Sequence, residues 1–403
     1  MRHGTSLPSG PARTLACLLP FTRFLLTSGC LLLFALGLTA ACSRGQGPED
    51  EFRIGLLLPL TGTPSLSTAQ HAAEALVARV NAEGGLALGD RRLKVRLLVE
   101  DTGNQVERVM AATVRLIRQE RVSALVGPYY SRDALPAAGV AEQNQVPLIS
   151  PSASTPALTE GRNYIFRVCL VDTVQGRIMA RFALEELGLK RAAVLYDEAD
   201  AYPSGLANLF CEAFAALGGQ VVAREAYSSG TTDFSAPLRR IRASGAQALF
   251  LPNFMEDLSR QLPQARAAGF GGVFLGGDSW DTDRRIHALA QAEGAFFSSD
   301  FAAQSLHGQL RQEADRYQEQ LGTPLDKNAA LTLDALGILL AAAKSVGSVD
   351  PVSLRAGIAS LSGYEGFTGK LTFAGQGDVV RSAHVLIIEG AQTRCRRELA
   401  PAQ

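Results

Sequence analysis

Short apolar runs alternate along this chain with longer segments whose apolar residues recur every three or four positions. Between residues 66 and 80, apolar side chains at 66, 69, 73, 76, 77 and 80 have the spacing of one face of a helix. Apolar runs that end in glycine or polar residues predict strands. In the first part of the chain we predict strands at 52–58, 93–100, 124–126, 148–149 and 164–168, with helices between them.

The same alternation begins again after residue 168. We predict helices at 173–187, 205–217, 234–243 and 257–268, and strands at 192–196, 220–227, 248–251 and 273–275. Later helices at 306–321 and 328–345 have only two short strands near them, at 370–373 and 384–388, so we expect this part to complete the earlier lobes. Strands that alternate with amphipathic helices are typical of parallel sheets covered on both faces. The predicted fold class is α/β, with two doubly wound parallel-sheet lobes.

Residues 1–41 have the features of a secretory signal. They hold three arginines, no acidic residue and an apolar run from Phe24 that leads into Leu38-Thr39-Ala40-Ala41-Cys42. A cysteine directly after small residues resembles the lipoprotein signal, in which the thiol is acylated and becomes the new N-terminus; Thr39 stands where that pattern more often has Leu. We predict a signal peptide at 1–41, a lipid anchor at Cys42 and a flexible tether at 42–50. An uncleaved membrane anchor is the alternative.

The remaining composition argues against several classes of protein. Residues 42–403 are too many for one typical core, which predicts two domains. They hold 36 basic and 39 acidic residues, a net charge near −3, so no basic excess favours nucleic acid. We also expect that no segment among them is apolar enough for a second membrane span. Cys169, Cys211 and Cys395 are far apart, without metal-ligand or framework spacing. Free buried thiols are expected, with a Cys169–Cys211 bridge as the alternative.

Catalytic and metal-binding motifs are absent from the sequence. The histidines after the signal form no His-Glu-x-x-His, and no Gly-x-Ser-x-Gly turn occurs. The segment from Gly84 to Gly89 resembles a phosphate loop in its glycines only, because Asp90 stands where that loop has lysine. We therefore predict no enzymatic activity, no metal and no cofactor.

The stretch from Leu125 to Thr159 is the best candidate for a binding site. Two predicted strands there end in Gly-Pro-Tyr-Tyr-Ser (127–131) and Ser-Pro-Ser-Ala-Ser-Thr (150–155). Ligands in open α/β sheets bind beyond the carboxyl ends of the strands. We predict that Ser131 is the N-cap of the next helix, where free N–H groups and the helix dipole favour an anion. The alternative is that these serines only cap helices and close turns.

Several short motifs occur in a fixed order: Ile54-Gly55, Leu58 with Thr61-Gly62, Val99-Glu100-Asp101, Gly127-Pro128, Ile149-Ser150-Pro151-Ser152-Ala153-Ser154, Phe166-Arg167, Gly276-Gly277-Asp278-Ser279-Trp280 and Gly369-Lys370-Leu371-Thr372-Phe373. Together, behind a lipoprotein-like signal, they resemble the periplasmic Leu/Ile/Val-binding proteins, the solute receptors of branched-chain amino-acid ABC transporters. The resemblance covers nearly all of residues 52–390.

That resemblance implies two lobes joined by three crossovers that close on a ligand. The crossovers would fall near 165–172, 295–302 and 376–384. Lobe 1 would comprise 51–168 and 300–378, lobe 2 would comprise 169–299 and 379–392, and 393–403 would be a tail.

The resemblance also implies roles for individual residues. Ser131 and Ser154 would bind the ligand carboxylate, while the Ser152 carbonyl and the Asp278 carboxylate would receive the ammonium. The walls of the pocket would be Tyr130, Tyr202, Phe254 and Trp280. The chain departs from the family pattern at Pro203-Ser204, where the family usually has Gly, and at Phe254, which replaces a frequent Tyr. Both departures leave the selectivity for the ligand side chain open.

The function implied is that of an extracytoplasmic receptor, anchored in the cell envelope, that binds a branched-chain or similar apolar amino acid and delivers it to an ABC permease. One alternative is a receptor of the same fold for urea, short amides or an aromatic acid, in which Asp278 need not meet an ammonium. Another is a ligand-sensing lipoprotein without a role in transport.

Overall fold

The computed structural model describes residues 51–62 and 65–400, and within them the chain builds two large sheets. The predicted signal peptide at 1–41, Cys42 and the predicted tether at 42–50 lie outside the described residues. The first sheet has the order β2-β3-β1-β4-β5-β6. Its strands are β1 (Glu51–Leu58), β2 (Leu86–Leu88), β3 (Arg91–Asp101), β4 (Ala124–Val126), β5 (Leu148–Ser150) and β6 (Ile165–Arg167). All neighbours in this sheet are parallel except β2 and β3.

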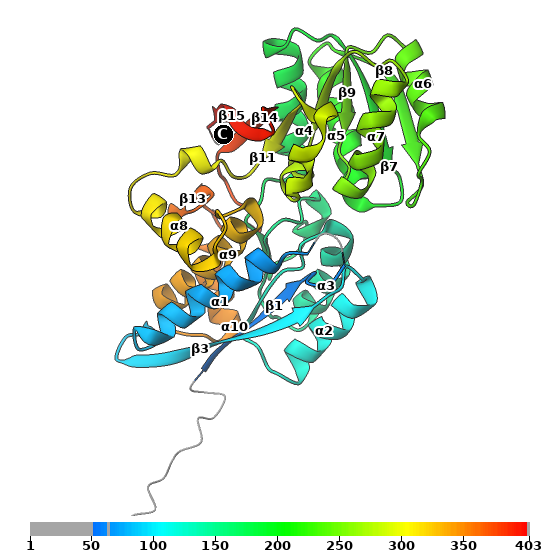
Figure 1. Cartoon of the computed structure of the whole chain (residues 1–403). Coiled ribbons are helices and arrows are strands. Elements are labelled where there is room, and N and C mark those ends of the chain that lie inside the picture. The colour runs from blue at the N-terminus through cyan, green and yellow to red at the C-terminus, as the bar shows by residue number, and fades with distance from the viewer. Residues whose placement is uncertain (1–50, 63–64, 401–403) are drawn as a thin grey trace, which may run out of the picture. The chain divides into compact units, whose positions relative to one another are not determined.

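The second sheet has the order β15-β14-β11-β10-β9-β7-β8. Its strands are β7 (Arg191–Asp197), β8 (Gln220–Tyr227), β9 (Ala248–Leu251), β10 (Val273–Gly276), β11 (Phe296–Ser299), β14 (Ala383–Glu389) and β15 (Gln392–Leu399). Strands β14 and β15 run antiparallel and extend the sheet beside β11, as Figure 1 shows. A separate hairpin pairs β12 (Tyr364–Gly366) with β13 (Gly369–Leu371).

Helices cover both faces of each sheet, which explains why the central strands, such as β4, β5 and β9, are apolar and buried. In the first sheet, α1 (Ser67–Ala82) and α9 (Lys327–Val346) pack on one face, and α2 (Val106–Arg118) and α3 (Ser131–Gln143) pack on the other. Helices α8 (Gly308–Leu321) and α10 (Pro351–Ala359) pack against α1 and α9. In α2 the buried residues recur at helical spacing, the pattern of an amphipathic helix.

The second sheet follows the same plan. Helices α4 (Asp172–Arg181) and α5 (Ala201–Ala216) cover one face, and α6 (Ser235–Ala243) and α7 (Met255–Ala267) cover the other. The predicted α/β class with two doubly wound, mostly parallel sheets is therefore confirmed. Each sheet also has an antiparallel edge, which is β2 in the first sheet and β14 with β15 in the second.

The prediction that residues 393–403 form a tail is wrong for 393–399, because this segment forms most of β15. It lies at the edge of the sheet and most of its residues are exposed. Charged residues are common on edge strands, where they discourage pairing with another chain, and they hide the apolar signal of a strand. The sequence analysis also missed β2, β11, β12 and α10, which are all short.

Helix α9 is the one helix among residues 51–62 and 65–400 that is long and apolar enough to cross a membrane. Most of its residues are buried in the first core, from Ala329 to Ala343, and that position accounts for the apolar composition. The expectation that no later segment has the composition of a span was therefore wrong for α9.

The chain passes between the two sheets three times, after β6, after β11 and before β14. Two buried charges join these passages. The Asp300 carboxylate accepts a hydrogen bond from the main-chain N–H of Leu170 at 2.6 Å and lies 3.5 Å from the Arg381 guanidinium. Arg381 also donates to the carbonyl oxygens of Val168, Asp300 and Thr368. One guanidinium therefore holds all three passages.

We predict that Arg381→Met lowers the free energy of unfolding by about 3–5 kcal/mol, because the buried Asp300 carboxylate loses its guanidinium partner. Denaturant unfolding followed by circular dichroism measures the change. Arg396→Met on the exposed face of β15 is the matched control and should stay within about 0.5 kcal/mol of the parent. Equal stabilities for the two variants would contradict the role of Arg381.

A second prediction concerns Asp172, the fully buried first residue of α4. Burial raises the pKa of Asp172 to about 8, so between pH 4 and 8 the folded protein keeps a proton that the unfolded chain releases. Stability from this group is present at low pH and is lost as the pH rises towards 8. The Asp172→Asn side chain cannot ionise. As the pH rises towards 8, the unfolding free energy of this variant should therefore fall less steeply than that of the parent. The two slopes should differ by up to about 1.4 kcal/mol per pH unit. Identical pH profiles from pH 5 to 8 would contradict this prediction.

Candidate functional site

A pocket lies where strands of both sheets end. Its lining residues are Tyr129, Tyr130, Ser131, Ser152, Tyr202, Phe254, Asp278, Ser279 and Thr282. The first four follow β4 and β5 of the first sheet, and the others follow β7, β9 and β10 of the second sheet. All five strands are parallel members of their sheets, so their carboxyl ends place these residues at one site.

Six of the eight residues predicted from sequence line this pocket, and Ser154 and Trp280 do not. Ser154 is buried, and its carbonyl oxygen accepts a hydrogen bond from the N–H of Asp172 at 2.9 Å. Trp280 belongs to the core of the second sheet. Its ring stacks on Phe297 with centroids 6.0 Å apart, and its Nε1 donates to the Leu251 carbonyl oxygen at 2.8 Å.

The position of Ser131 corrects the prediction that it is an N-cap. Tyr130 is the N-cap of α3 and Ser131 is the first residue of the helix. The Ser131 hydroxyl oxygen accepts a hydrogen bond from the N–H of Thr155 at 3.3 Å, which links the segments after β4 and β5. Ser131 is nevertheless in the first turn of a helix whose N-terminal end meets the pocket, an arrangement that favours an anion.

Aromatic rings from both sheets form the apolar part of the pocket. Phe254 contacts Tyr130 edge to face at 5.2 Å between centroids, and it contacts Tyr202 at 5.3 Å. Room for Tyr202 depends on a glycine, since a Cβ built on Gly277 would lie 2.5 Å from the Tyr202 hydroxyl oxygen. The glycine directly before Asp278 therefore lets a tyrosine reach the carboxylate.

Asp278 is held by two partners. Its Oδ1 accepts a hydrogen bond from the Tyr202 hydroxyl at 3.0 Å, and its Oδ2 lies 2.8 Å from Nζ of Lys327. Lys327 also donates to the main-chain carbonyl oxygen of Asp278 at 2.7 Å. Burial by itself would lower the pKa of Lys327, but the carboxylates of Asp278, Asp300 and Asp281 outweigh it and raise that pKa. Lys327 is therefore a buried ammonium with a buried carboxylate as its partner.

A second ion pair joins the two sheets near the aromatic rings. Arg132 of α3 pairs with Asp200, the N-cap of α5, and donates to Asn104. The Arg132 guanidinium also lies over the rings of Tyr130 and Phe254, at 5.2 and 5.9 Å from their centroids. Its side chain is 31% exposed, so this contact faces solvent while the Lys327 contact does not.

Sequence reasoning missed Tyr129, Ser279 and Thr282, which adjoin predicted residues and could have been included for that reason. It also missed Lys327. No local signal marks this lysine, because its partner Asp278 lies 49 positions away and the contact depends on how α9 packs. Cys169, Cys211 and Cys395 have free thiols, so the alternative bridge between the first two is not formed. Within 51–62 and 65–400, no three His, Cys, Asp or Glu side chains are placed to hold a metal.

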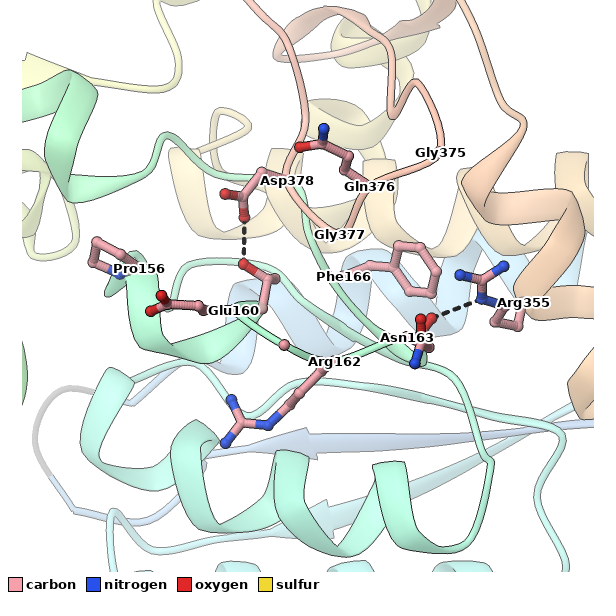
Figure 2. A pocket seen from close by; sticks show the side chains of 12 residues that line it. Pro156, Glu160, Arg162, Asn163, Phe166, Arg355, Gly375, Gln376, Gly377 and Asp378 are labelled. Carbon is pink, nitrogen blue, oxygen red and sulfur yellow. Dashed lines mark hydrogen bonds between the residues drawn. The ribbon is translucent and has the colours of Figure 1, made fainter.

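A larger hollow lies apart from these strand ends and contains none of the predicted site residues. It is lined by residues 156 and 159–163, by Phe166 and Arg355, and by residues 375–378, as Figure 2 shows. Asp378 there accepts hydrogen bonds from Thr159 at 2.7 Å and from the buried Arg167 at 2.7 Å. The carboxylate is therefore occupied in fixing the loop before β14. We assign the candidate site to the smaller pocket, because side chains of both sheets meet there.

Comparison with known proteins agrees with this geometry. Residues 51–390 match the periplasmic binding protein family. The Leu/Ile/Val-binding protein homolog 3 of Brucella melitensis is 26% identical over 86% of this chain and 94% of its own length.

Two solved structures are also similar. The leucine binding protein LivK from Thermotoga maritima is 30% identical with a TM-score of 0.80, over 87% of this chain and 99% of that chain. The second is the branched-chain amino acid transporter substrate binding protein LivJ from Streptococcus pneumoniae, in complex with isoleucine. It is 26% identical with a TM-score of 0.79, and the match covers 87% of this chain and 100% of that chain. The resemblance stated from the motifs is confirmed: the chain belongs to the periplasmic binding protein family, among the extracytoplasmic substrate-binding receptors related to the Leu/Ile/Val-binding proteins.

Proposed function

We propose that this chain is the solute receptor of an ABC importer and that it binds a small apolar carboxylic acid, either an amino acid or an acid without the amino group. The observation that carries the proposal is one pocket built from strand ends of both sheets, with hydroxyl groups on one side and aromatic rings on the other. A closing hinge at the three passages would bring these two sides together around a ligand. The ligand then passes to a permease without chemical change.

The carboxylate end of the ligand is assigned to the first sheet. Ser131 and Ser152 offer neutral donors there, and the first turn of α3 supplies N–H groups with the positive end of a helix dipole. The apolar end is assigned to Tyr130, Tyr202 and Phe254. Isoleucine in LivJ and leucine in the name of LivK support amino acids with branched side chains as the first ligands to test.

We predict that Ser131→Ala weakens binding of any carboxylate ligand, because a hydrogen bond to a charged group is lost. Such a bond is worth about 1.5–3 kcal/mol, which corresponds to roughly a 10- to 150-fold loss of affinity. Native mass spectrometry of the purified protein identifies a co-purified small molecule, and calorimetry with that molecule or with leucine measures affinity. Ser235→Ala, at the first position of α6, is the matched control.

Three outcomes would count against this proposal. A parent protein that neither retains a small molecule nor binds one from a panel of amino and organic acids would overturn the receptor assignment. Binding that survives Ser131→Ala unchanged would remove Ser131 from the carboxylate site. Conversion of the ligand by repurified protein would place the chain among enzymes.

We propose further that residues 1–41 are removed and that Cys42 is acylated, which would anchor the receptor to a membrane. Support comes from the order of basic, apolar and small residues before that cysteine. Cys42→Ser should lose labelling by a radioactive fatty acid and leave the membrane fraction or remain uncleaved. Cys30→Ser should keep its label, since this cysteine leaves with the signal. Unchanged labelling of Cys42→Ser would reject the anchor.

A further inference from the structure

Asp278 is the one carboxylate among the described residues that line the pocket, and an amino-acid ligand would need it for its ammonium. Both oxygens of this carboxylate already have partners, the Tyr202 hydroxyl on Oδ1 and Lys327 Nζ on Oδ2. The main-chain carbonyl oxygen of Asp278 also accepts from Lys327. The protein itself therefore places an ammonium at the group that would receive the ligand's ammonium.

The position of Lys327 makes this pairing necessary. The lysine is the first residue of α9, where the helix dipole is unfavourable for a cation, and its side chain is 0% exposed. A buried ammonium without an anion is strongly unfavourable, so Lys327 requires a carboxylate. Asp326 beside it is occupied, because its two oxygens accept from the Ala329 N–H and the Thr68 hydroxyl.

The other acidic side chains near Lys327 have partners of their own. Asp300 Oδ2 lies 3.9 Å from Lys327 Nζ, but Asp300 is engaged by Arg381 and by the Leu170 N–H. Burial raises the pKa of Asp172 to about 8, so that this side chain is mostly protonated at neutral pH. Asp281 is also close, but its Oδ2 accepts a hydrogen bond from the Ser299 hydroxyl at 2.6 Å. Asp278, at 2.8 Å from Lys327 Nζ, is thus nearer to the ammonium than Asp300 is.

We propose that Lys327 is a specificity-determining residue which selects carboxylic acids that lack an α-amino group. This inference rests on the proposed receptor function and names the class of ligand for the same pocket. A zwitterion would have to displace Lys327 from Asp278 or place its ammonium beside a like charge. An acid without the amino group avoids both penalties, and its carboxylate still meets Ser131 and Ser152.

The test compares two pairs of ligands that differ only in the amino group: leucine with 4-methylpentanoate, and phenylalanine with 3-phenylpropanoate. Calorimetry on the full receptor should show that the parent binds the deaminated member of a pair more tightly. Breaking a desolvated charge pair corresponds to roughly a 30-fold to few-thousand-fold difference in affinity, and we expect a preference in that range. This comparison needs no variant.

Lys327→Met then tests whether the lysine is responsible. The variant frees the Asp278 carboxylate. The affinity for the amino acid, relative to the affinity for its deaminated partner, should therefore rise by at least about tenfold, a change of about 1.4 kcal/mol. Lys344→Met, on an exposed position of the same helix, should keep the parent preference. The double variant Lys327→Met with Asp278→Asn removes both charges and replaces the single variant if that one unfolds. It should bind the deaminated acid, and its affinity for the amino acid should not rise relative to that acid.

The outcomes separate this inference from the receptor assignment. A parent that binds leucine or phenylalanine more tightly than the deaminated partner overturns the inference and leaves the receptor function in place. An unchanged preference in a folded Lys327→Met also overturns the role of the lysine. A parent that binds no member of either pair overturns the inference, and if it also retains no small molecule from the cell, the receptor function falls with it.

Discussion

The buried ion pair of Lys327 and Asp278 is the contact on which the pocket depends. It joins the first turn of α9, a helix of the first core, to the residue that follows β10 of the second sheet. Charges removed from water require partners, and here each partner belongs to a different sheet. The ion pair therefore fixes both the charge of the pocket and the approach of the two sheets.

The same requirement extends from the pocket to the passages between the sheets. Lys327 Nζ lies 3.9 Å from Asp300 Oδ2, and Asp300 is bound by Arg381, which holds all three passages. Four charges thus form a continuous buried row from the ligand site to the connections between the sheets. Replacing one of them changes the electrostatics of the others, so the pocket and the passages belong to one network of charges.

Most of the fold could be predicted from the sequence, because strands buried on both faces are continuous apolar runs and their covering helices are amphipathic. The placement of Ser131 and Ser152 at one pocket followed from the rule that parallel strands end at the same edge of a sheet, whereas Asp278 was expected there from the family resemblance. Trp280 could not be placed, since a tryptophan after two glycines fits a pocket wall and a core equally well. The partner of Asp278 could not be predicted either, because it comes from a distant helix whose packing no local pattern specifies.

The two ion pairs that join the sheets differ in their contact with water. Arg132 and Asp200 lie partly exposed over the aromatic rings, whereas Lys327 and Asp278 are enclosed. Dissolved ions weaken exposed charge pairs and leave buried pairs almost unaffected. An extracytoplasmic receptor meets changes in the salinity of its surroundings more directly than a protein of the cell interior. Such changes therefore weaken the outer contact between the sheets and leave the enclosed contact of Lys327 with Asp278 almost unchanged.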